Sequence, residues 1–335
     1  MNMFRFVIIG CGRMGFAHSR RLADHAESQL VGFFDPVRAA AVDLRARFAP
    51  SAVVAETFEE LLRLDADAAV IGTPTILHRE QVIAAAARGW HVLCEKPLAD
   101  NRDGINTLCE TANRRQDLNF QLGYQRRFWT PYERMKAEIE SGRHGAIHAV
   151  TSLNAERWQQ TISGTWRDQP AINPGGFLGD AGSHKLDILL HVTGLAVKWV
   201  FAASDSAGSD VEIVSSVTGR FCNGALLTLS LTGHAGSFTE ELFVHCERAD
   251  LILRDGQLWI GRENQQQRIA TPPGEAGPAS TRNPISGFLE LLGGRSGNVA
   301  PFAAAGPVFD LTAAILESSR SRQPVELAAD CSSSA

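Results

Sequence analysis

The chain has 335 residues, of which 44% are hydrophobic and 21% are charged, and its formal net charge is −5. The length favours two domains, because single hydrophobic cores rarely grow beyond about 250–300 residues. The negative charge argues against a nucleic-acid-binding surface, which needs clustered basic residues. The sequence contains no run of about 18 apolar residues, so we expect no membrane-spanning helix.

The N-terminus and the cysteines allow a prediction of the cellular compartment of the protein. Residues 1–12 lack the charged, then apolar, then small-residue order of a secretory signal. The six cysteines are widely spaced and form no C-x-x-C pair. We therefore predict reduced thiols and a cytoplasmic protein.

Short apolar segments alternate with helical patterns through the first 120 residues. We expect helices up to residue 23 and at 36–48, 76–89 and 100–115, and strands at 4–10, 28–35, 66–74, 90–97 and 118–125. Continuous apolar strands separated by helices of about 10–15 residues are typical of a parallel sheet that is covered on both faces. The first domain, at 1–122, is therefore predicted to be a doubly wound α/β domain.

The pattern changes after about residue 124. We expect a helix at 130–142, a final helix and short strand within 307–327, and strands at 146–155, 212–221, 224–233 and 240–261, the last interrupted by a turn at "DGQ". Residues 261–308 are rich in Gly, Pro, Ser and Asn and are predicted to form surface loops, and the tail 328–335 is predicted to be frayed. The second domain, at 123–335, is thus predicted to be an α/β domain with an open, largely antiparallel sheet.

A glycine-rich turn follows the first strand. Gly10, Gly12 and Gly15 form G-x-G-x-x-G between that strand and the first helix. In this context Gly10 permits the tight turn, Gly12 lets the backbone approach a pyrophosphate, and Gly15 lets helix and strand pack closely. The free amides at the start of the helix, those of Arg13 and Met14, are predicted to receive the phosphates.

An acidic residue ends the second strand. Asp35 lies 20 residues after Gly15, where a carboxylate accepts hydrogen bonds from the ribose hydroxyls and repels a 2′-phosphate. We therefore predict NAD as the cofactor. Arg38 can pair with a 2′-phosphate, so NADP stays possible. The competing interpretation is a glycine-rich turn with an unrelated exposed Asp.

The strand at 90–97 ends in "EKP". Ligands of open α/β sheets bind beyond the carboxyl ends of the strands, so Lys96 is predicted to face the cofactor. Pro97 can hold a cis bond that fixes the direction of the lysine. The alternative is a surface pair of Glu95 and Lys96 ahead of a helix.

A polar series crosses the apolar stretch 173–194. Asp180, His184, Asp187 and His191 are spaced by four, three and four residues, which predicts one stripe on a helix. The stripe is about 16 Å long, so its four residues cannot meet one ion, and we predict no metal site. A solvated face is one interpretation. The spacing favours an acid/base pair, in which Asp180 and His184 address one substrate hydroxyl and His184 takes its proton as hydride leaves carbon.

Taken together, these motifs resemble the glucose–fructose oxidoreductase/inositol dehydrogenase/rhizopine catabolism (Gfo/Idh/MocA) family, and the resemblance covers nearly the whole chain. It rests on the glycine motif, "EKP" at 95–97 and "GGFLGDAGSHKLD" at 175–187. "TPTILHRE" at 73–80 is similar to the family's Thr-Pro-Asn-x-x-His turn beside the nicotinamide, and "GYQRRF" at 123–128 to its entry into the second domain. Thr75 stands where Asn is usual, and Pro174 stands where the first of three glycines is usual.

The resemblance implies roles for these residues. Lys96 and His184 would be the catalytic pair, with Asp180 beside them, acting on a secondary alcohol of a sugar or cyclitol. The cofactor would also contact Thr73, Pro74, Thr75, His78, Glu95 and Lys96, and the substrate would also contact Arg127, Trp166 and Arg167. The open sheet commonly makes oligomer contacts in the family, so a homodimer or homotetramer is expected.

Three functions fit these patterns. The first is an NAD(P)-dependent dehydrogenase of a sugar, a sugar derivative or an inositol. The second is a redox-neutral enzyme that oxidises a sugar carbon transiently so that a glycosidic bond can be eliminated. The third is a non-catalytic nucleotide-binding regulator. The presence of Lys96, Asp180 and His184 together favours an enzyme, and accumulation of NADH would identify the dehydrogenase.

Overall fold

The computed structural model describes residues 3–173, 175–272, 274, 275, 277, 280–328 and 331. The chain divides into two compact units. The first comprises Met1–Tyr124 and Asn283–Gly306, and the second comprises Gln125–Arg282 and Pro307–Ala335. The fold class expected from the sequence is confirmed, because one unit contains a parallel sheet and the other a largely antiparallel one.

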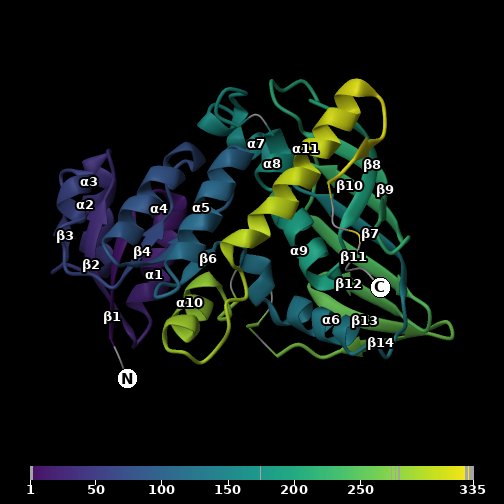
Figure 1. Ribbon diagram of the computed structural model, residues 1–335, viewed down its shortest axis with the longest axis horizontal. Helices are drawn as coiled ribbons and strands as arrows, with labels where there is room; N and C mark the ends of the chain where they lie inside the picture. The colour runs from purple at the N-terminus through teal and green to yellow at the C-terminus, as the bar shows by residue number, and fades with distance from the viewer. Residues whose placement is uncertain are drawn as a thin grey trace. The chain divides into compact units, whose positions relative to one another are not determined.

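The first unit is built on a six-stranded parallel sheet with the order β3-β2-β1-β4-β5-β6. Its strands, in purple and blue in Figure 1, are β1 (Phe4–Ile9), β2 (Ser28–Phe34), β3 (Val53–Val54), β4 (Ala68–Ile71), β5 (His91–Cys94) and β6 (Phe120–Leu122). Its helices in Met1–Tyr124 are α1 (Arg13–Ala23), α2 (Arg38–Phe48), α3 (Phe58–Leu61), η1 (Thr75–Leu77), α4 (His78–Ala87) and α5 (Arg102–Arg114). Strand β3 and helix α3 were not expected from the sequence, because both are too short to show a period.

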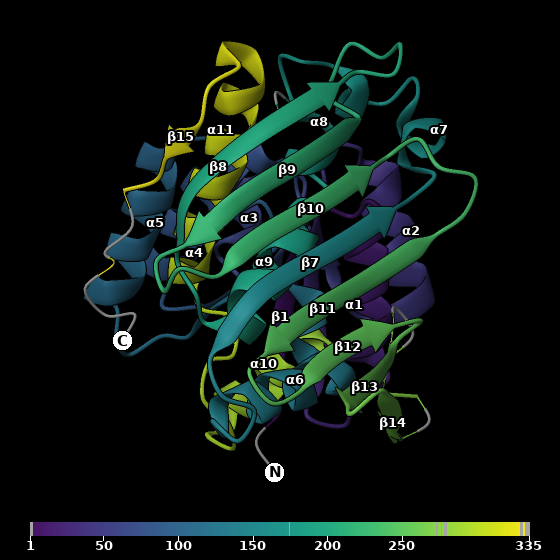
Figure 2. The same ribbon diagram turned by 90° about the vertical axis from the view of Figure 1, so that its right-hand side faces the viewer.

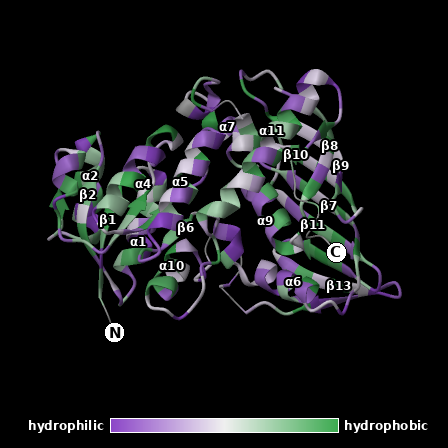
Figure 3. Cartoon of the chain, viewed as in Figure 1, coloured by the Kyte–Doolittle hydropathy of each residue, from purple (hydrophilic) through white to green (hydrophobic). Residues whose placement is uncertain are grey.

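The strands of this sheet are buried from both sides. All four residues of β4 are inaccessible to solvent, as are the last four of β1. Figure 3 shows β1 and β2 mainly in the hydrophobic colour. Continuous apolar strands of this kind are the reason that a parallel sheet was predictable from the sequence.

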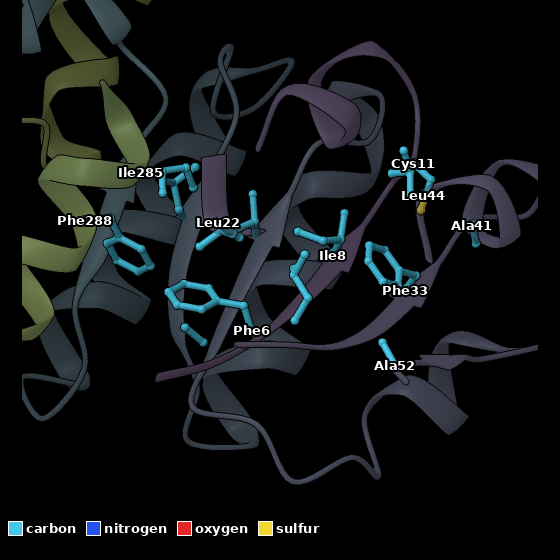
Figure 4. Close-up of a cluster of buried hydrophobic side chains, with 14 of the residues drawn as sticks. Phe6, Ile8, Cys11, Leu22, Phe33, Ala41, Leu44, Ala52, Ile285 and Phe288 are labelled. Carbon is cyan, nitrogen blue, oxygen red and sulfur yellow. The ribbon is translucent and has the colours of Figure 1, made fainter. Parts of the chain in front are cut away.

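The segment 283–306 corrects the expected domain division, which placed it among surface loops of a continuous second domain at 123–335. It contains α10 (Pro284–Leu292) and η4 (Phe302–Ala304). Helix α10 packs Ile285, Phe288 and Leu289 into the core around β1, and the rings of Phe288 and Phe6 lie 6.3 Å apart (Figure 4). The flanking Gly, Ser and Asn residues hid this short apolar helix in the sequence.

The second unit is built on a nine-stranded sheet with the order β14-β13-β12-β11-β7-β10-β9-β8-β15, in which only the β7–β10 pair among the described strands is parallel. Its strands are β7 (Ile147–Ala155), β8 (Val197–Asp205), β9 (Val214–Phe221), β10 (Leu226–Thr232), β11 (Thr239–Cys246), β12 (Asp250–Arg254), β13 (Gln257–Arg262), β14 (Gln265–Ile269) and β15 (Val325–Glu326). Its helices are η2 (Gln125–Phe128), α6 (Thr130–Glu140), α7 (Trp158–Ile162), η3 (Trp166–Asp168), α8 (Gly176–Gly179) and α9 (Ser183–Thr193). Helix α11 (Ala305–Ser321) begins at the end of the first unit's second segment and continues in this one.

Two strands of this sheet were not expected. No strand was predicted at β8, and β14 lies within residues 261–308, for which loops were predicted. The "DGQ" turn is confirmed, because Asp255 and Gly256 both have positive φ and join β12 to β13 as a two-residue hairpin.

One face of the second unit's sheet is open. Figure 2 shows β8, β9, β10, β7 and β11 toward the viewer, with α9 and α6 behind them. Side chains of a strand alternate between the two faces of the sheet, so the residues of β9 are largely buried and exposed in alternation. The open face carries large apolar side chains at Leu226 (49% exposed), Phe201 (41%) and Leu153 (39%).

The cysteine prediction is wrong for two residues. Cys222 and Cys331 form a disulfide and their Cα atoms lie 5.1 Å apart. They are 109 residues apart in the chain, and pairing of β15 with β8, and of β8 with β9, brings their segments together. Cys11, Cys94, Cys109 and Cys246 are free thiols. Apart from Ala328 and Cys331, the tail predicted to be frayed lies outside the described residues.

Among the described residues, no helix is both long enough and apolar enough to cross a bilayer.

Candidate functional site

The glycine turn joins β1 to α1. Gly10 has φ +90°, and a Cβ there would lie 2.8 Å from backbone atoms of Gly72 and Thr73. A Cβ at Gly15 would lie 2.1 Å from the carbonyl oxygen of Gly10, so helix and turn approach too closely for any side chain. At Gly12, in contrast, a Cβ would meet nothing within 4 Å. The backbone at Gly12 therefore borders open space beside the start of the helix.

The start of α1 suits an anion. Gly12 is the N-cap residue, and it supplies no side-chain hydrogen bond to the helix. The first turn, which begins at Arg13 and Met14, contains no acidic residue. Uncapped amides and the positive end of the helix dipole together favour a phosphate group. These residues therefore fit the pyrophosphate of a dinucleotide.

Asp35 lies directly against this turn. Its Oδ2 accepts a hydrogen bond from the backbone N–H of Cys11 (2.7 Å), and its Oδ1 accepts one from Val37 (2.8 Å). The acidic residue and the glycine turn are thus brought together as the spacing predicted. Arg38, at the start of α2, is exposed, and its guanidinium lies 3.5 Å from the carboxylate of Glu56.

Two further turns lie at the carboxyl ends of neighbouring strands. Thr73, Pro74 and Thr75 follow β4, and Glu95 and Lys96 follow β5, which pairs with β4. His78, at the start of α4, is fully buried and reaches both turns, with Nε2 3.0 Å from the carbonyl oxygen of Thr73 and Nδ1 2.9 Å from that of Pro97. Burial lowers the pKa of His78. The Lys96–Pro97 peptide bond is cis.

Glu95 is an internal residue, so the alternative of a surface Glu–Lys pair is wrong. Its side chain is buried, and Oε1 lies 2.8 Å from Nε2 of His18 on α1. Burial opposes ionisation of this carboxyl group, but the hydrogen bonds from His18 and from the backbone of Lys96, together with the charge of Lys96, outweigh it and lower the pKa of Glu95. Lys96 itself is half-buried.

The stretch 173–194 is not one helix, and the stripe prediction is wrong in this respect. Helix α8 ends at Gly179, and Asp180 follows it with φ −91° and ψ −85°, outside α9. Asp180 and His184 are therefore not neighbours on a common helix face. The chain doubles back tightly, since the N–H of Gly182 donates to Phe177 and a Cβ at Gly182 would lie 2.6 Å from the Leu178 carbonyl oxygen.

Asp180 is engaged with two segments that precede it. Its Oδ2 accepts hydrogen bonds from Nε of Arg167 (3.0 Å) and Nε1 of Trp158 (3.3 Å). Two of the candidate substrate residues, Asp180 and Arg167, are thus brought together. Trp158 was missed as a partner, because nothing in its spacing connects it to a carboxylate 22 residues away. The side chain of Trp166 and the whole of Pro174 lie outside the described residues. His184 is half-buried in the first turn of α9.

None of the four stripe residues is exposed, since Asp180 and Asp187 are buried and His184 and His191 are half-buried, so the interpretation as a solvated face is also wrong. Asp187 is buried, and both its oxygens lie 3.0 Å from Nε of Arg127, which thus forms an internal ion pair. Burial raises the pKa of Asp187 to about 6, with Arg127 opposing the shift. At His191, burial and then the charges of Arg127 and Lys136 lower the pKa to about 3.

Both units are similar to parts of known proteins. Residues 4–124 match a family model described as "Oxidoreductase family, NAD-binding Rossmann fold", and residues 132–252 match the GFO/IDH/MocA C-terminal domain. The solved structure of the WlbA dehydrogenase from Bordetella pertussis, in complex with NADH and UDP-GlcNAcA, has a TM-score of 0.81 and 22% identity, covering 98% of this chain and 99% of that one. This likeness shows a common fold.

Two relatives are similar in sequence. The rhizopine catabolism protein MocA of Rhizobium meliloti is 28% identical over 200 residues, which are 58% of each chain. An inositol 2-dehydrogenase of Acidothermus cellulolyticus is 30% identical over 219 residues, covering 64% of this chain and 57% of that protein. The matches thus span less than two thirds of the length of these relatives. The two family matches establish that the chain belongs to the Gfo/Idh/MocA oxidoreductases and that its first unit carries their NAD-binding Rossmann fold.

Proposed function

We propose that the protein is an NAD-dependent dehydrogenase that oxidises or reduces a secondary alcohol of a sugar, a sugar derivative or an inositol. The observation that carries this proposal is the position of Lys96. It follows β5 of an NAD-binding sheet, between the buried carboxylate of Glu95 and the carbonyl group of Pro97, each of which is hydrogen-bonded to a buried histidine. The two relatives named for inositol oxidation and rhizopine catabolism support the substrate class.

The residues at the glycine turn favour NAD. The open space at Gly12 and the uncapped start of α1 suit the pyrophosphate, and Asp35 offers a carboxylate for ribose hydroxyls. NAD, when bound, supplies the group that exchanges hydride with the substrate carbon. Arg38 is paired with Glu56, so a 2′-phosphate would have to compete for it.

The side chains have separate tasks in this proposal. Lys96 holds and polarises the reacting oxygen, and His184 takes the hydroxyl proton in the oxidative direction. Asp180 binds the substrate beside them, in an orientation maintained by Arg167 and Trp158. Thr73, Pro74 and Thr75 border the nicotinamide, and His78 supports their turn.

The test is a turnover screen with NAD and NADP against sugars, inositols and sugar acids, followed at the absorbance of the reduced nicotinamide. We expect reduced cofactor to accumulate with NAD and one member of the panel. Lys96→Met and His184→Asn should each lower kcat by on the order of 10²–10⁴-fold, the range typical of acid/base and electrostatic assistance. Lys198→Met, which changes an exposed lysine of β8, should leave kcat unchanged.

Two outcomes would contradict the proposal. Full activity of both variants on the substrate would remove the assigned roles. NAD binding without accumulation of reduced cofactor on any member of the panel would favour the redox-neutral enzyme or the regulator instead.

We also propose that the open sheet face makes a homodimer or homotetramer. The apolar side chains of Leu153, Phe201 and Leu226 are spread over β7, β8 and β10, and side chains of this kind are commonly covered in oligomers. Light scattering gives the mass of the particle in solution, and a monomer would contradict this assignment.

A further inference from the structure

The two sequence neighbours of Lys96 are each bound to a buried histidine. His18 of α1 contacts the carboxylate of Glu95 through Nε2 (2.8 Å), and His78 of α4 contacts the carbonyl oxygen of Pro97 through Nδ1 (2.9 Å). Both imidazoles are completely buried. The turn that carries the lysine is therefore held by two different helices, one on each side of Lys96.

The surroundings of His18 determine which of its two ring nitrogens carries the hydrogen and donates it. Its Nδ1 has no hydrogen-bond partner among the residues that the structure describes. A buried N–H without an acceptor is costly, so the ring hydrogen belongs on Nε2, where it is donated to Glu95. The other carboxylate oxygen of Glu95, Oε2, accepts the backbone N–H of Lys96 at 3.2 Å. One carboxylate thus links His18 to the backbone of the lysine.

Gly123 leaves the space in which this carboxylate lies. A Cβ at Gly123 would be 2.9 Å from Cδ, Oε1 and Oε2 of Glu95. The backbone N–H of Gly123 donates to Cys94, so this approach is fixed by the pairing of adjacent strands. A side chain at position 123 would therefore displace the carboxylate without removing any hydrogen-bonding group from the chain.

Several charged or titratable groups act on Glu95 besides its hydrogen-bond partners. Arg21 lies on the same helix as His18, and the others come from the strand, the turn and the neighbouring helix: Cys94, Lys96 and His78. The Glu95 carboxylate is the negative group that these side chains share. Its position accordingly affects the electrostatic environment of Lys96.

We propose that His18 is a positioning residue, which fixes Glu95 and through it the direction and environment of Lys96, while His78 fixes the other side of the turn. Helix α1 begins at the glycine turn and carries His18 further along its length. The same helix thus connects the dinucleotide-binding turn to the lysine turn. This inference rests on the proposed function in one respect, since it takes Lys96 to be the reacting lysine.

Three variants separate positioning from simple loss of structure. His18→Leu removes the donor, whereas His18→Gln retains an N–H close to the position of Nε2. Gly123→Ala keeps all partners and shifts the Glu95 carboxylate. Thermal unfolding first shows whether each variant is folded. If His18→Leu does not fold, Gly123→Ala alone tests the effect of shifting the carboxylate.

The kinetic readout compares kcat with KM. We expect His18→Leu and Gly123→Ala to lower kcat by about 10-fold or more, with the KM for NAD within about 3-fold of the wild type. His18→Gln should retain kcat within about 3-fold. Equal losses in His18→Leu and His18→Gln, or a loss confined to KM, would overturn the inference.

A second readout needs neither NAD nor substrate. The chain has four lysines, so acylation of Lys96 can be followed by peptide mass spectrometry, with exposed Lys198 as the internal reference. We expect the ratio of the two acylation rates to change by about 3-fold or more in His18→Leu and Gly123→Ala and to stay unchanged in His18→Gln. An unchanged ratio in all folded variants would overturn the inference even if the protein proves to be a dehydrogenase. If the wild type shows no turnover, the proposed function fails and this ratio alone decides the role of His18.

Discussion

The molecule contains two glycine-rich turns that lead into helices, one at 10–15 in the first unit and one at 175–182 in the second. Each has a glycine where a Cβ would collide with a backbone oxygen, 2.1 Å from Gly10 for Gly15 and 2.2 Å from Glu212 for Gly176. The partner of Gly15 belongs to the same turn, whereas the partner of Gly176 lies 36 positions further along the chain (212 − 176). The spacing of glycines along the chain therefore predicts the close approach at Gly15. It contains no information on the close approach at Gly176, whose partner is distant in the sequence.

Substitutions within the first turn are expected to have the largest effects. Gly15→Ala should cost more than about 5 kcal/mol of the free energy of unfolding, because helix and turn must separate to admit the Cβ. Gly12→Ala should leave the stability within about 1 kcal/mol, since a Cβ there meets nothing within 4 Å. It should instead weaken NAD binding by about 10-fold or more, because the methyl group occupies the space predicted for the pyrophosphate.

Denaturant unfolding and NAD titration by fluorescence measure the two quantities separately. Gly142→Ala changes a glycine that closes α6 in the second unit and provides a control for NAD binding. Unchanged NAD affinity in Gly12→Ala would show that the dinucleotide is bound elsewhere.

Most of the first unit was predictable because its information is local. The apolar runs of β1, β4 and β5 are continuous, and the spacing from Gly15 to Asp35 brings the carboxylate to the glycine turn, where it accepts the N–H of Cys11. Helix α10 was not predictable in this way. Its apolar side chains fill the core of the first unit only because the chain returns there after strands β7 to β14 of the second sheet.

The candidate site was likewise predictable only where its information is local in the sequence. Residue types at Lys96, Asp180 and His184 were identified from motifs, but their surroundings come from distant segments. Asp180 was placed on a helix with His184, and it lies instead in the turn before that helix, bound to Arg167. The bend depends on the close approach of Gly182 to the backbone of Leu178. The periodicity of apolar residues does not predict such an approach.

The second comparison concerns the pair of Arg127 and Asp187, which holds η2 against α9 in the second unit. Arg127→Met should cost about 3 to 5 kcal/mol of the free energy of unfolding, because it leaves a buried carboxylate without its partner. The double variant Arg127→Met/Asp187→Asn should recover most of this loss, since the uncompensated charge is gone. Denaturant unfolding of the four proteins in the cycle measures the coupling.

An exposed pair in the first unit provides the matched control for this cycle. Arg79 and Asp103 are 2.9 Å apart and exposed, and Arg79→Met should change the stability by less than about 1 kcal/mol. Similar losses for the two arginines would show that burial of Asp187 is not what makes its partner necessary.

The smallest effect that we expect is the pH dependence contributed by His191, at the end of the same helix. Its folded-state pKa is about 3, against an ordinary value of 6.5, because burial disfavours the charged ring and Arg127 and Lys136 repel it. Below pH 6.5 the unfolded chain binds a proton that the folded chain does not, so the free energy of unfolding falls as the pH decreases from 6.5 toward 3.

His191→Gln removes this contribution and leaves that of Asp187, which has the opposite sign. The raised pKa of Asp187, about 6 against 3.8, gives a stabilising contribution at low pH that is lost as the pH rises through 6. Subtracting the stability of the variant from that of the wild type at each pH therefore isolates His191. We expect the difference to decline by on the order of 1 kcal/mol between pH 6.5 and 4, a modest figure because solvent screens a partly exposed ring. A difference that stays constant over this range would mean that His191 is protonated alike in the folded and unfolded chains, and that its ring is hydrated rather than packed at the end of α9.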